Sequence, residues 1–132
     1  MASIFTKIIN RELPANVIAD NKKFIAFLDI HPIAKGHTLV VPKVEVDYIF
    51  DLGDAFLSEI MLFAKSVSRG IQAAVPCVRV GIAVVGLEIP HAHLHLVPIN
   101  TVHDIDFSKA PLSFTEKELA DTAKAIQAHI PS

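Results

Sequence analysis

Three histidines alternate with apolar residues in the segment HAHLHL, residues 91–96. Successive side chains of an extended strand point to opposite faces of a sheet, so His91, His93 and His95 are predicted to share one face. Neighbours in such a row lie roughly 6.5 to 7 Å apart, because a strand rises about 3.3 Å per residue. Imidazoles on a partly buried face need hydrogen-bond partners, so three of them are a costly way to fill a core. The row therefore indicates a reactive or ligand-binding site.

Two kinds of chemistry fit this spacing. In the first, an H-x-H pair and a third histidine from another strand supply the three nitrogen ligands of a catalytic zinc ion. In the second, an imidazole that is neutral at pH 7 attacks phosphorus with its lone pair and forms a covalent N–P intermediate. Protonated neighbours would then stabilise the phosphoryl oxygens or protonate a leaving group. The row by itself leaves both chemistries open.

Four strands are predicted, the last of which contains the histidine row. Two β-prone runs within residues 23–43 flank a loop that contains proline and glycine, which predicts a pair of antiparallel strands. Residues 77–85 and 91–99 are predicted to form two more strands, joined into a hairpin by the short segment GLEIP. Residues 101–111 are predicted to form a surface loop. Together with helical segments, these strands predict an α+β fold.

Two amphipathic helices are predicted. The first begins at Asp51 or Asp54, either of which is a suitable N-cap, and extends to Val75. Its apolar stripe, at helical spacing, consists of Phe56, Ile60, Phe63, Val67 and Ile71. The second follows a capping box formed by Thr115 and Glu118 near the end of the chain. Its apolar stripe consists of Leu119, Ala123, Ile126 and Ile130.

Composition narrows the class of protein. A chain of 132 residues that is 52% hydrophobic can build one core, so residues 1–132 are predicted to form a single domain. Its 12 basic and 14 acidic residues give a net charge of −2, which argues against a nucleic-acid partner. No apolar run approaches the roughly 18 residues of a membrane span, so the protein is expected to be cytoplasmic. Its single cysteine, Cys77, excludes an intramolecular disulfide and a cysteine-rich metal site.

The histidine run and the segments upstream of it resemble the histidine triad (HIT) family of nucleotide hydrolases and transferases. Residues 91–97, HAHLHLV, fit the family signature H-φ-H-φ-H-φ-φ, in which φ is apolar. Residues 4–43 contain IFTKII, AFLDI and GHTLVVPK, similar to the family's nucleoside-phosphoramidase-like branch. The resemblance implies a HIT-like fold, with an antiparallel sheet of about five strands, one long helix and a C-terminal helix. It also implies a homodimer and a reaction that needs no metal or organic cofactor.

The resemblance implies a role for each matching residue. His93 resembles the nucleophile that attacks the α-phosphorus of a nucleotide and becomes transiently nucleotidylated. His95 resembles the residue that contacts phosphate oxygens, while His91 and the upstream His37 resemble a supporting pair. Asp29 matches a carboxylate that accepts hydrogen bonds from the two ribose hydroxyls. The positions that match the apolar base pocket are Phe5, Ile8, Phe27 and Ile30.

The loop before the triad departs from the family pattern. Gly86 is retained, but Leu87 replaces a Gln-type residue, and Glu88 occupies the place of a small polar residue that helps to hold the phosphates. A carboxylate repels a nearby phosphate, so Glu88 is expected to face solvent, with binding of a cationic leaving group as the alternative. Ser3 and Thr6 stand where some relatives have Cys-x-x-Cys, so a structural zinc ion is not expected.

The sequence therefore predicts an enzyme that cleaves a purine nucleoside monophosphate from an amine or another leaving group, through a covalent intermediate on His93. Its partner is expected to be a small nucleotide, with neither nucleic acid nor a membrane involved. One alternative is a zinc-dependent hydrolase that uses the histidine row as ligands. The other is a nucleotide-binding module whose altered loop has reduced its catalysis.

Overall fold

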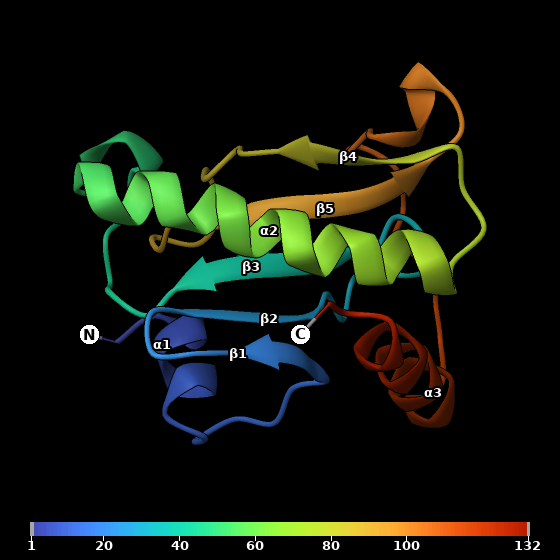
Figure 1. Ribbon diagram of the computed structural model, residues 1–132, viewed down its shortest axis with the longest axis horizontal. Helices are drawn as coiled ribbons and strands as arrows, with labels where there is room; N and C mark the ends of the chain where they lie inside the picture. Colours follow the sequence, from blue (N-terminus) through green and yellow to red (C-terminus); the bar gives the residue numbers. More distant parts are fainter. Residues whose placement is uncertain (1, 132) are drawn as a thin grey trace.

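A computed structural model describes residues 2–131 and contains one antiparallel sheet of five strands in the order β1-β2-β3-β5-β4 (Figure 1). The strands are β1 (Val17–Asp20), β2 (Phe24–Leu28), β3 (Thr38–Pro42), β4 (Arg79–Ala83) and β5 (Leu94–Ile99). The helices are α1 (Ile4–Ile9), α2 (Asp54–Ala74) and α3 (Glu116–Ala128), with short 3₁₀ turns η1 (Ile49–Asp51) and η2 (Val102–Asp104). The fold class is α+β, as the sequence predicts.

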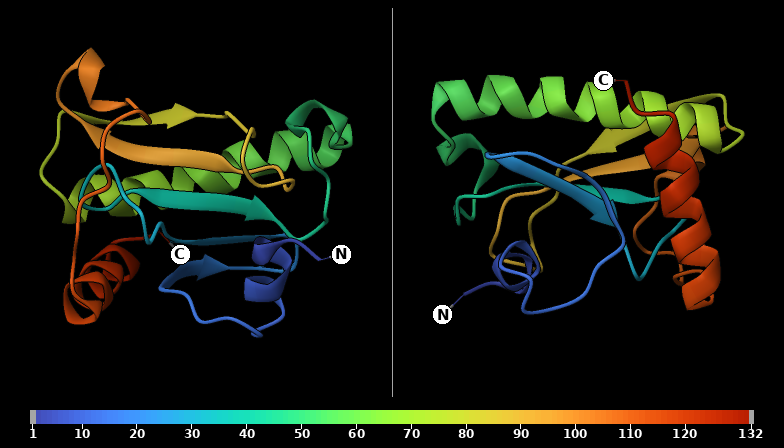
Figure 2. Two further views of the ribbon diagram at one scale, coloured as in Figure 1. Left: turned by 180° about the vertical axis from the view of Figure 1, so that it is seen from behind. Right: turned by 60° about the horizontal axis from the view of Figure 1, so that its bottom comes forward.

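The two faces of the sheet have different coverings, because alternate residues of each strand point to opposite sides. On β2, Phe24 and Leu28 pack into the main core beneath α2, whereas Phe27 joins a second apolar cluster with Phe5 of α1. Figure 2 shows α2 on one side of the sheet and α1 on the other. The long helix therefore seals one face, and the opposite face is left for a site.

Helix α2 packs through the predicted stripe. Ile60, Val67 and Ile71 are fully buried, and each contributes about 1.5 to 3 kcal/mol by leaving water. The predicted N-cap is wrong, since Gly53 occupies that position and makes no side-chain cap. Asp51 ends the preceding 3₁₀ turn instead. Asp54 lies in the first turn of the helix, where its negative charge interacts favourably with the helix dipole.

Helix α3 begins with the predicted capping box, in which the Thr115 side chain accepts from the Glu118 amide and the Glu118 carboxylate accepts from the Thr115 amide. Ile126 of this helix is fully buried in the main core. At Gly70, an added Cβ would lie 2.8 Å from the carbonyl oxygen of Ile126. A glycine at this position of α2 therefore lets α3 approach closely.

Helix α1 and strand β1 were not predicted from the sequence. The Ser3 hydroxyl caps α1 by accepting from the Thr6 amide, and the helix buries only Phe5. With six residues, α1 is too short to show a convincing helical period, and β1 has only four. Among residues 2–131, no helix is both long and apolar enough to cross a membrane.

Strands β4 and β5 form the predicted antiparallel hairpin, but they are shorter than expected. Strand β5 begins at Leu94, so His91 and His93 precede it and the predicted single strand over residues 91–99 is wrong at its start. Other backbone hydrogen bonds replace strand pairing there. The Ala92 amide donates to the Val46 carbonyl at 2.7 Å, and the His91 amide donates to the Ile89 carbonyl at 2.8 Å.

Candidate active site

The sheet brings His37, His95 and Asp29 together from three neighbouring strands. His95 lies on β5 opposite Leu39, and His37 immediately precedes β3 on the same face as Leu39. The Nε2 of His37 and the Nδ1 of His95 are 3.0 Å apart. Asp29 follows the last residue of β2, and its Oδ2 lies 3.6 Å from the Nε2 of His37. Residues far apart in the sequence thus form one cluster on the face opposite α2.

Backbone partners fix the tautomers of this pair. The Ile33 amide donates to the Nδ1 of His37 at 3.1 Å, so a neutral His37 carries its proton on Nε2. That proton is donated to the Nδ1 of His95. A neutral His95 therefore has its own proton on Nε2, where it can serve as a hydrogen-bond donor to a ligand.

His93 is held in the opposite tautomer. Its Nδ1 lies 2.8 Å from the carbonyl oxygen of His91, which can only accept, so Nδ1 carries the proton. The lone pair of a neutral His93 is then on Nε2. The ring is 6% exposed and is flanked by the edges of Phe5 and His95, with centroids 5.0 Å and 4.9 Å away. This environment fixes one orientation of the imidazole.

Burial keeps the three clustered histidines uncharged at neutral pH. It lowers the pKa of His95 from its ordinary value of 6.5 to about 4, assisted by the neighbouring His93 and His37. Burial also lowers the pKa of His93 and of His37, while the Asp29 carboxylate opposes each shift. Each ring therefore offers one lone pair and one proton.

His91 does not share a row with the other two triad histidines. Its ring is fully buried, with Nε2 donating to the carbonyl of Pro42 at 2.8 Å and Nδ1 accepting from the Ser3 hydroxyl at 2.7 Å. The Glu45 carboxylate accepts from the Ser3 amide and the Thr6 hydroxyl, and these bonds lower its pKa. His91 therefore anchors the chain next to His93 and cannot offer a free ring nitrogen.

This anchor was not predicted from the sequence. Ser3 and Thr6 stand out there only as positions without the cysteines of some relatives, and no pattern indicates a role for Glu45. Ser3 is a residue type that favours the N-cap position, which could have predicted the start of α1. The contact between Ser3 and His91 crosses 88 positions, and no local pattern reveals it.

The four predicted base-pocket residues are only partly brought together. Phe5 and Phe27 are buried with ring centroids 5.7 Å apart, and Ile8 packs against their cluster. Ile30 is 63% exposed and is not a member of the buried cluster. The structure thus provides an apolar wall next to His93, with Ile30 free to contact a ligand from outside.

The short loop before the triad lies near His93. Gly86 has φ of 71°, a left-handed conformation that favours glycine, and it lines an apolar cavity of about 510 Å³ together with His93 and Leu87. Glu88 is exposed, in agreement with the expectation that it faces solvent. Its negative charge is nevertheless close enough to oppose the lowering of the His93 pKa.

One group of possible metal ligands occurs among residues 2–131. Asp29, His37 and His95 each offer a ligand atom, and these atoms lie within 4.8 Å of one another. The histidine row by itself does not supply three zinc ligands, because both ring nitrogens of His91 are occupied by protein partners. A metal on the alternative set would have to replace the hydrogen bond between His37 and His95.

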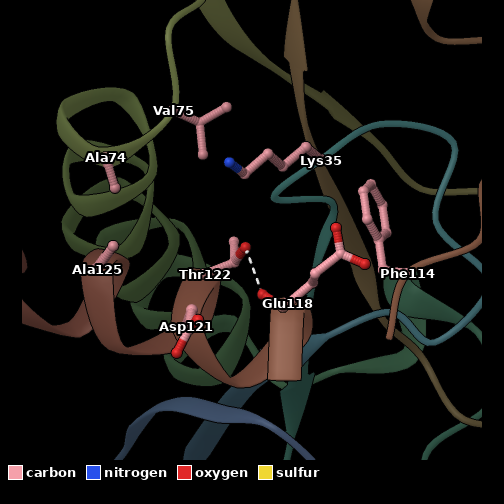
Figure 3. A pocket seen from close by; sticks show the side chains of 8 residues that line it. All are labelled: Lys35, Ala74, Val75, Phe114, Glu118, Asp121, Thr122 and Ala125. Carbon is pink, nitrogen blue, oxygen red and sulfur yellow. Dashed lines mark hydrogen bonds between the residues drawn. The ribbon is translucent and has the colours of Figure 1, made fainter. Parts of the chain in front are cut away.

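A second cavity, of about 360 Å³, lies between the end of α2 and α3 (Figure 3). Lys35 and Phe114 reach it from neighbouring loops, while Glu118 lines it and also caps α3. None of the predicted site residues lines this cavity. The histidine cluster therefore remains the candidate active site.

A five-stranded antiparallel sheet that carries a histidine cluster on the face opposite its long helix defines a protein of the histidine triad class. The sequence model of the HIT domain matches residues 10–102. The chain therefore belongs to the HIT family, in agreement with the resemblance seen in the sequence.

Curated relatives match most of the chain. It is 37% identical over 102 residues to an uncharacterized HIT-like protein of Methanocaldococcus jannaschii, a match that covers 72% of this chain and 77% of the relative. It is 35% identical over 98 residues to the adenosine 5′-monophosphoramidase HNT1 of Saccharomyces cerevisiae, which covers 74% of this chain and 62% of the relative.

Solved structures agree with the fold. A hypothetical histidine triad nucleotide-binding protein of Sulfolobus tokodaii has a TM-score of 0.81 at 30% identity, with 96% of this chain and 90% of that chain covered. A HIT-like protein of Bartonella henselae has a TM-score of 0.84 at 24% identity, covering 96% of this chain and 95% of that chain. The second likeness supports the fold alone.

Proposed function

We propose that this protein cleaves a nucleoside monophosphate from an amine or another leaving group through a nucleotidyl intermediate on His93. The observation that carries the proposal is the hydrogen bond from the Nδ1 of His93 to the His91 carbonyl, because it leaves the Nε2 lone pair as the nucleophile. The yeast relative's name, adenosine 5′-monophosphoramidase, supports this substrate class.

Two displacements complete the reaction. In the first, the Nε2 of His93 bonds to the α-phosphorus while the bond from phosphorus to the leaving group breaks, and an amine leaving group takes up a proton from solvent. In the second, water attacks the same phosphorus and releases a proton to solvent, the N–P bond breaks, and the nucleoside monophosphate leaves. The Nε2–H of His95 donates to a phosphoryl oxygen in both steps, since His37 occupies its other nitrogen. In this scheme, His37 and His91 position the two reacting imidazoles.

The intermediate provides the direct test. Rapid quenching of the enzyme with adenosine 5′-phosphoramidate labelled at phosphorus is expected to leave label on the protein that acid removes, since N–P bonds of histidine are acid-labile. The control is the His129→Asn variant, which changes an exposed histidine at the end of α3 and should label normally. Turnover without any bound label, at quench times shorter than one turnover, would exclude the covalent route.

The metal alternative is favoured by one observation, the cluster of Asp29, His37 and His95. Stoichiometric zinc in the purified protein, found by elemental analysis, together with loss of turnover on chelation, would support a zinc-dependent hydrolase. Tight nucleotide binding with neither turnover nor bound label would instead support a binding module, in which the altered loop around Glu88 no longer promotes the reaction.

We also propose that the protein forms a homodimer through the edge strand β4. This strand pairs only with β5, so one side of its backbone has unpaired N–H and C=O groups. Apolar side chains surround it, with Ile82 45% exposed and Met61 of the adjacent α2 51% exposed. A second copy that pairs with β4 about a two-fold axis would bury both features.

Ile82→Lys is expected to convert the dimer to a monomer, because it places a charge on the shared edge. Sedimentation velocity at several protein concentrations measures the change. Ile4→Lys is the matched control, since Ile4 is 46% exposed but belongs to α1 on the opposite side of the sheet. A wild-type protein that sediments as a monomer at all concentrations would refute this interface.

A further inference from the structure

A loop beyond the family match carries an aromatic ring onto the histidine cluster. The HIT domain match ends at residue 102, and Phe107 follows it in the segment between η2 and α3. The Phe107 ring centroid lies 4.6 Å from that of His95 and 6.1 Å from that of His37. Residues 101–111 were predicted to be a plain surface loop, so this contact is a finding of the structure.

Hydrogen bonds within the segment and to its neighbours hold Phe107 in place. The Asp106 carboxylate accepts from the Ser108 amide at 3.0 Å, which shapes the turn around Phe107. Further along, the Leu112 amide donates to the carbonyl of Pro32 at 2.8 Å. Pro32 belongs to the loop that contains Ile33, the donor to the Nδ1 of His37. The segment is thus attached to the same loop that orients the histidine pair.

Four rings form a continuous series across the site. The centroid distances are 5.0 Å from Phe5 to His93, 4.9 Å from His93 to His95 and 4.6 Å from His95 to Phe107. Phe5 is 3% exposed, whereas Phe107 is 40% exposed. Phe107 therefore stands at the solvent end of the series, where water would otherwise reach the hydrogen bond between His37 and His95.

We propose that Phe107 is a positioning residue for the reaction: its ring shields the hydrogen bond between His37 and His95 from water, and so keeps the Nε2–H of His95 directed at the substrate phosphate. This inference rests on the proposed function, because the proposed reaction uses that proton as a hydrogen-bond donor to the phosphoryl oxygen. Water admitted to the pair would compete for the Nδ1 of His95 and would permit other tautomers and ring orientations.

The tautomer of His95 reports whether this cover is intact. While the Nδ1 of His95 accepts from the Nε2 of His37, a neutral His95 carries its proton on Nε2 alone. Water that competes for Nδ1 would allow the proton to occupy either nitrogen.

The test compares Phe107→Ala and Phe107→Leu with Phe114→Ala. Phe114 belongs to the segment leading into α3 but lines the cavity of Figure 3, away from the histidines. The tautomer of the His95 ring is measured at fixed neutral pH from its ¹⁵N chemical shifts, and kcat/KM is measured with adenosine 5′-phosphoramidate. Phe107→Ala is expected to leave His95 in a mixture of its two neutral tautomers, where the wild type has the Nε2–H form alone, and to lower kcat/KM about 10-fold. Phe107→Leu, which keeps an apolar cover, should produce a smaller change in both.

An unchanged His95 tautomer in Phe107→Ala overturns the proposal, and so does an equal change in Phe114→Ala, which would indicate a general loosening of the segment. If Phe107→Ala does not fold, Phe107→Leu decides by the same NMR measurement. That measurement needs no substrate, so it reports on Phe107 even if the wild-type protein shows no turnover. Absence of turnover and label with a normal Phe107 effect would instead refute the proposed function.

Discussion

Replacement of His93 by asparagine is expected to lower the rate of phosphoramidate cleavage by about 10⁴-fold or more while nucleotide binding is retained. The side-chain amide of asparagine can donate to the His91 carbonyl in place of the Nδ1 of His93. It has no ring nitrogen with a lone pair, so the covalent route is lost. Removal of an enzyme's nucleophile commonly costs this much, since only binding and electrostatic stabilisation remain.

Single-turnover kinetics and calorimetric titration with the nucleoside monophosphate measure the two quantities separately. His129→Asn, at an exposed helix end, is the control for the substitution itself. A decrease of less than about 10-fold in the single-turnover rate would contradict a nucleophilic role for His93. Equal losses of rate and affinity would instead indicate that the substitution disturbs the binding site.

Much of the architecture could be predicted from local patterns. The stripe of Ile60, Val67 and Ile71 predicted α2, and the box of Thr115 and Glu118 predicted the start of α3. Both signals depend on residues within a few positions of one another, which is why the sequence displays them. Helix α1 offers only the cap residue Ser3, because the helix is too short for a helical period and is held by tertiary contacts of Phe5.

The histidine row shows how a correct pattern can lead to a wrong geometry. Alternation predicted three imidazoles on one face, but only His95 lies within β5. The segment before it forms a tight turn, so the His91 ring is buried among Ser3 and Pro42 while His93 stays beside His95. Alternation cannot detect this, because it does not show where strand pairing stops: β4 ends at Ala83, opposite His95, and the pairing with β3 stops at Leu94.

The cluster of Asp29, His37 and His95 was named from the family resemblance, and the sheet register supplies a physical reason for it. Residues 27 and 39 pair across β2 and β3, and residues 39 and 95 pair across β3 and β5. Asp29 is two positions from residue 27, and His37 is two positions from residue 39. Both side chains therefore lie on the same face of the sheet as His95. The contacts of Phe107 and Glu45 could not be predicted from the sequence, because their partners lie on elements that are distant in the chain.

Asp29→Asn is expected to lower kcat/KM for adenosine 5′-phosphoramidate about 100-fold, mainly through KM. A hydrogen bond to a charged group contributes about 1.5 to 3 kcal/mol, and loss of the charge weakens both proposed bonds to the ribose hydroxyls. The substitution preserves shape, and the asparagine oxygen can still accept from the His31 amide as Oδ1 does now at 2.8 Å. Steady-state kinetics with purified wild type and variant measure the effect.

The 2′,3′-dideoxy analogue of the same substrate separates a ribose contact from an indirect effect. If Asp29 binds the hydroxyls, the wild type and the variant should differ little on this analogue, because neither can make the missing bonds. Asp29 also lies 3.6 Å from His37 and opposes the lowering of the pKa of His37, His93 and His95. An equal loss on both substrates would therefore mean that the carboxylate acts on the histidines and not on the ribose.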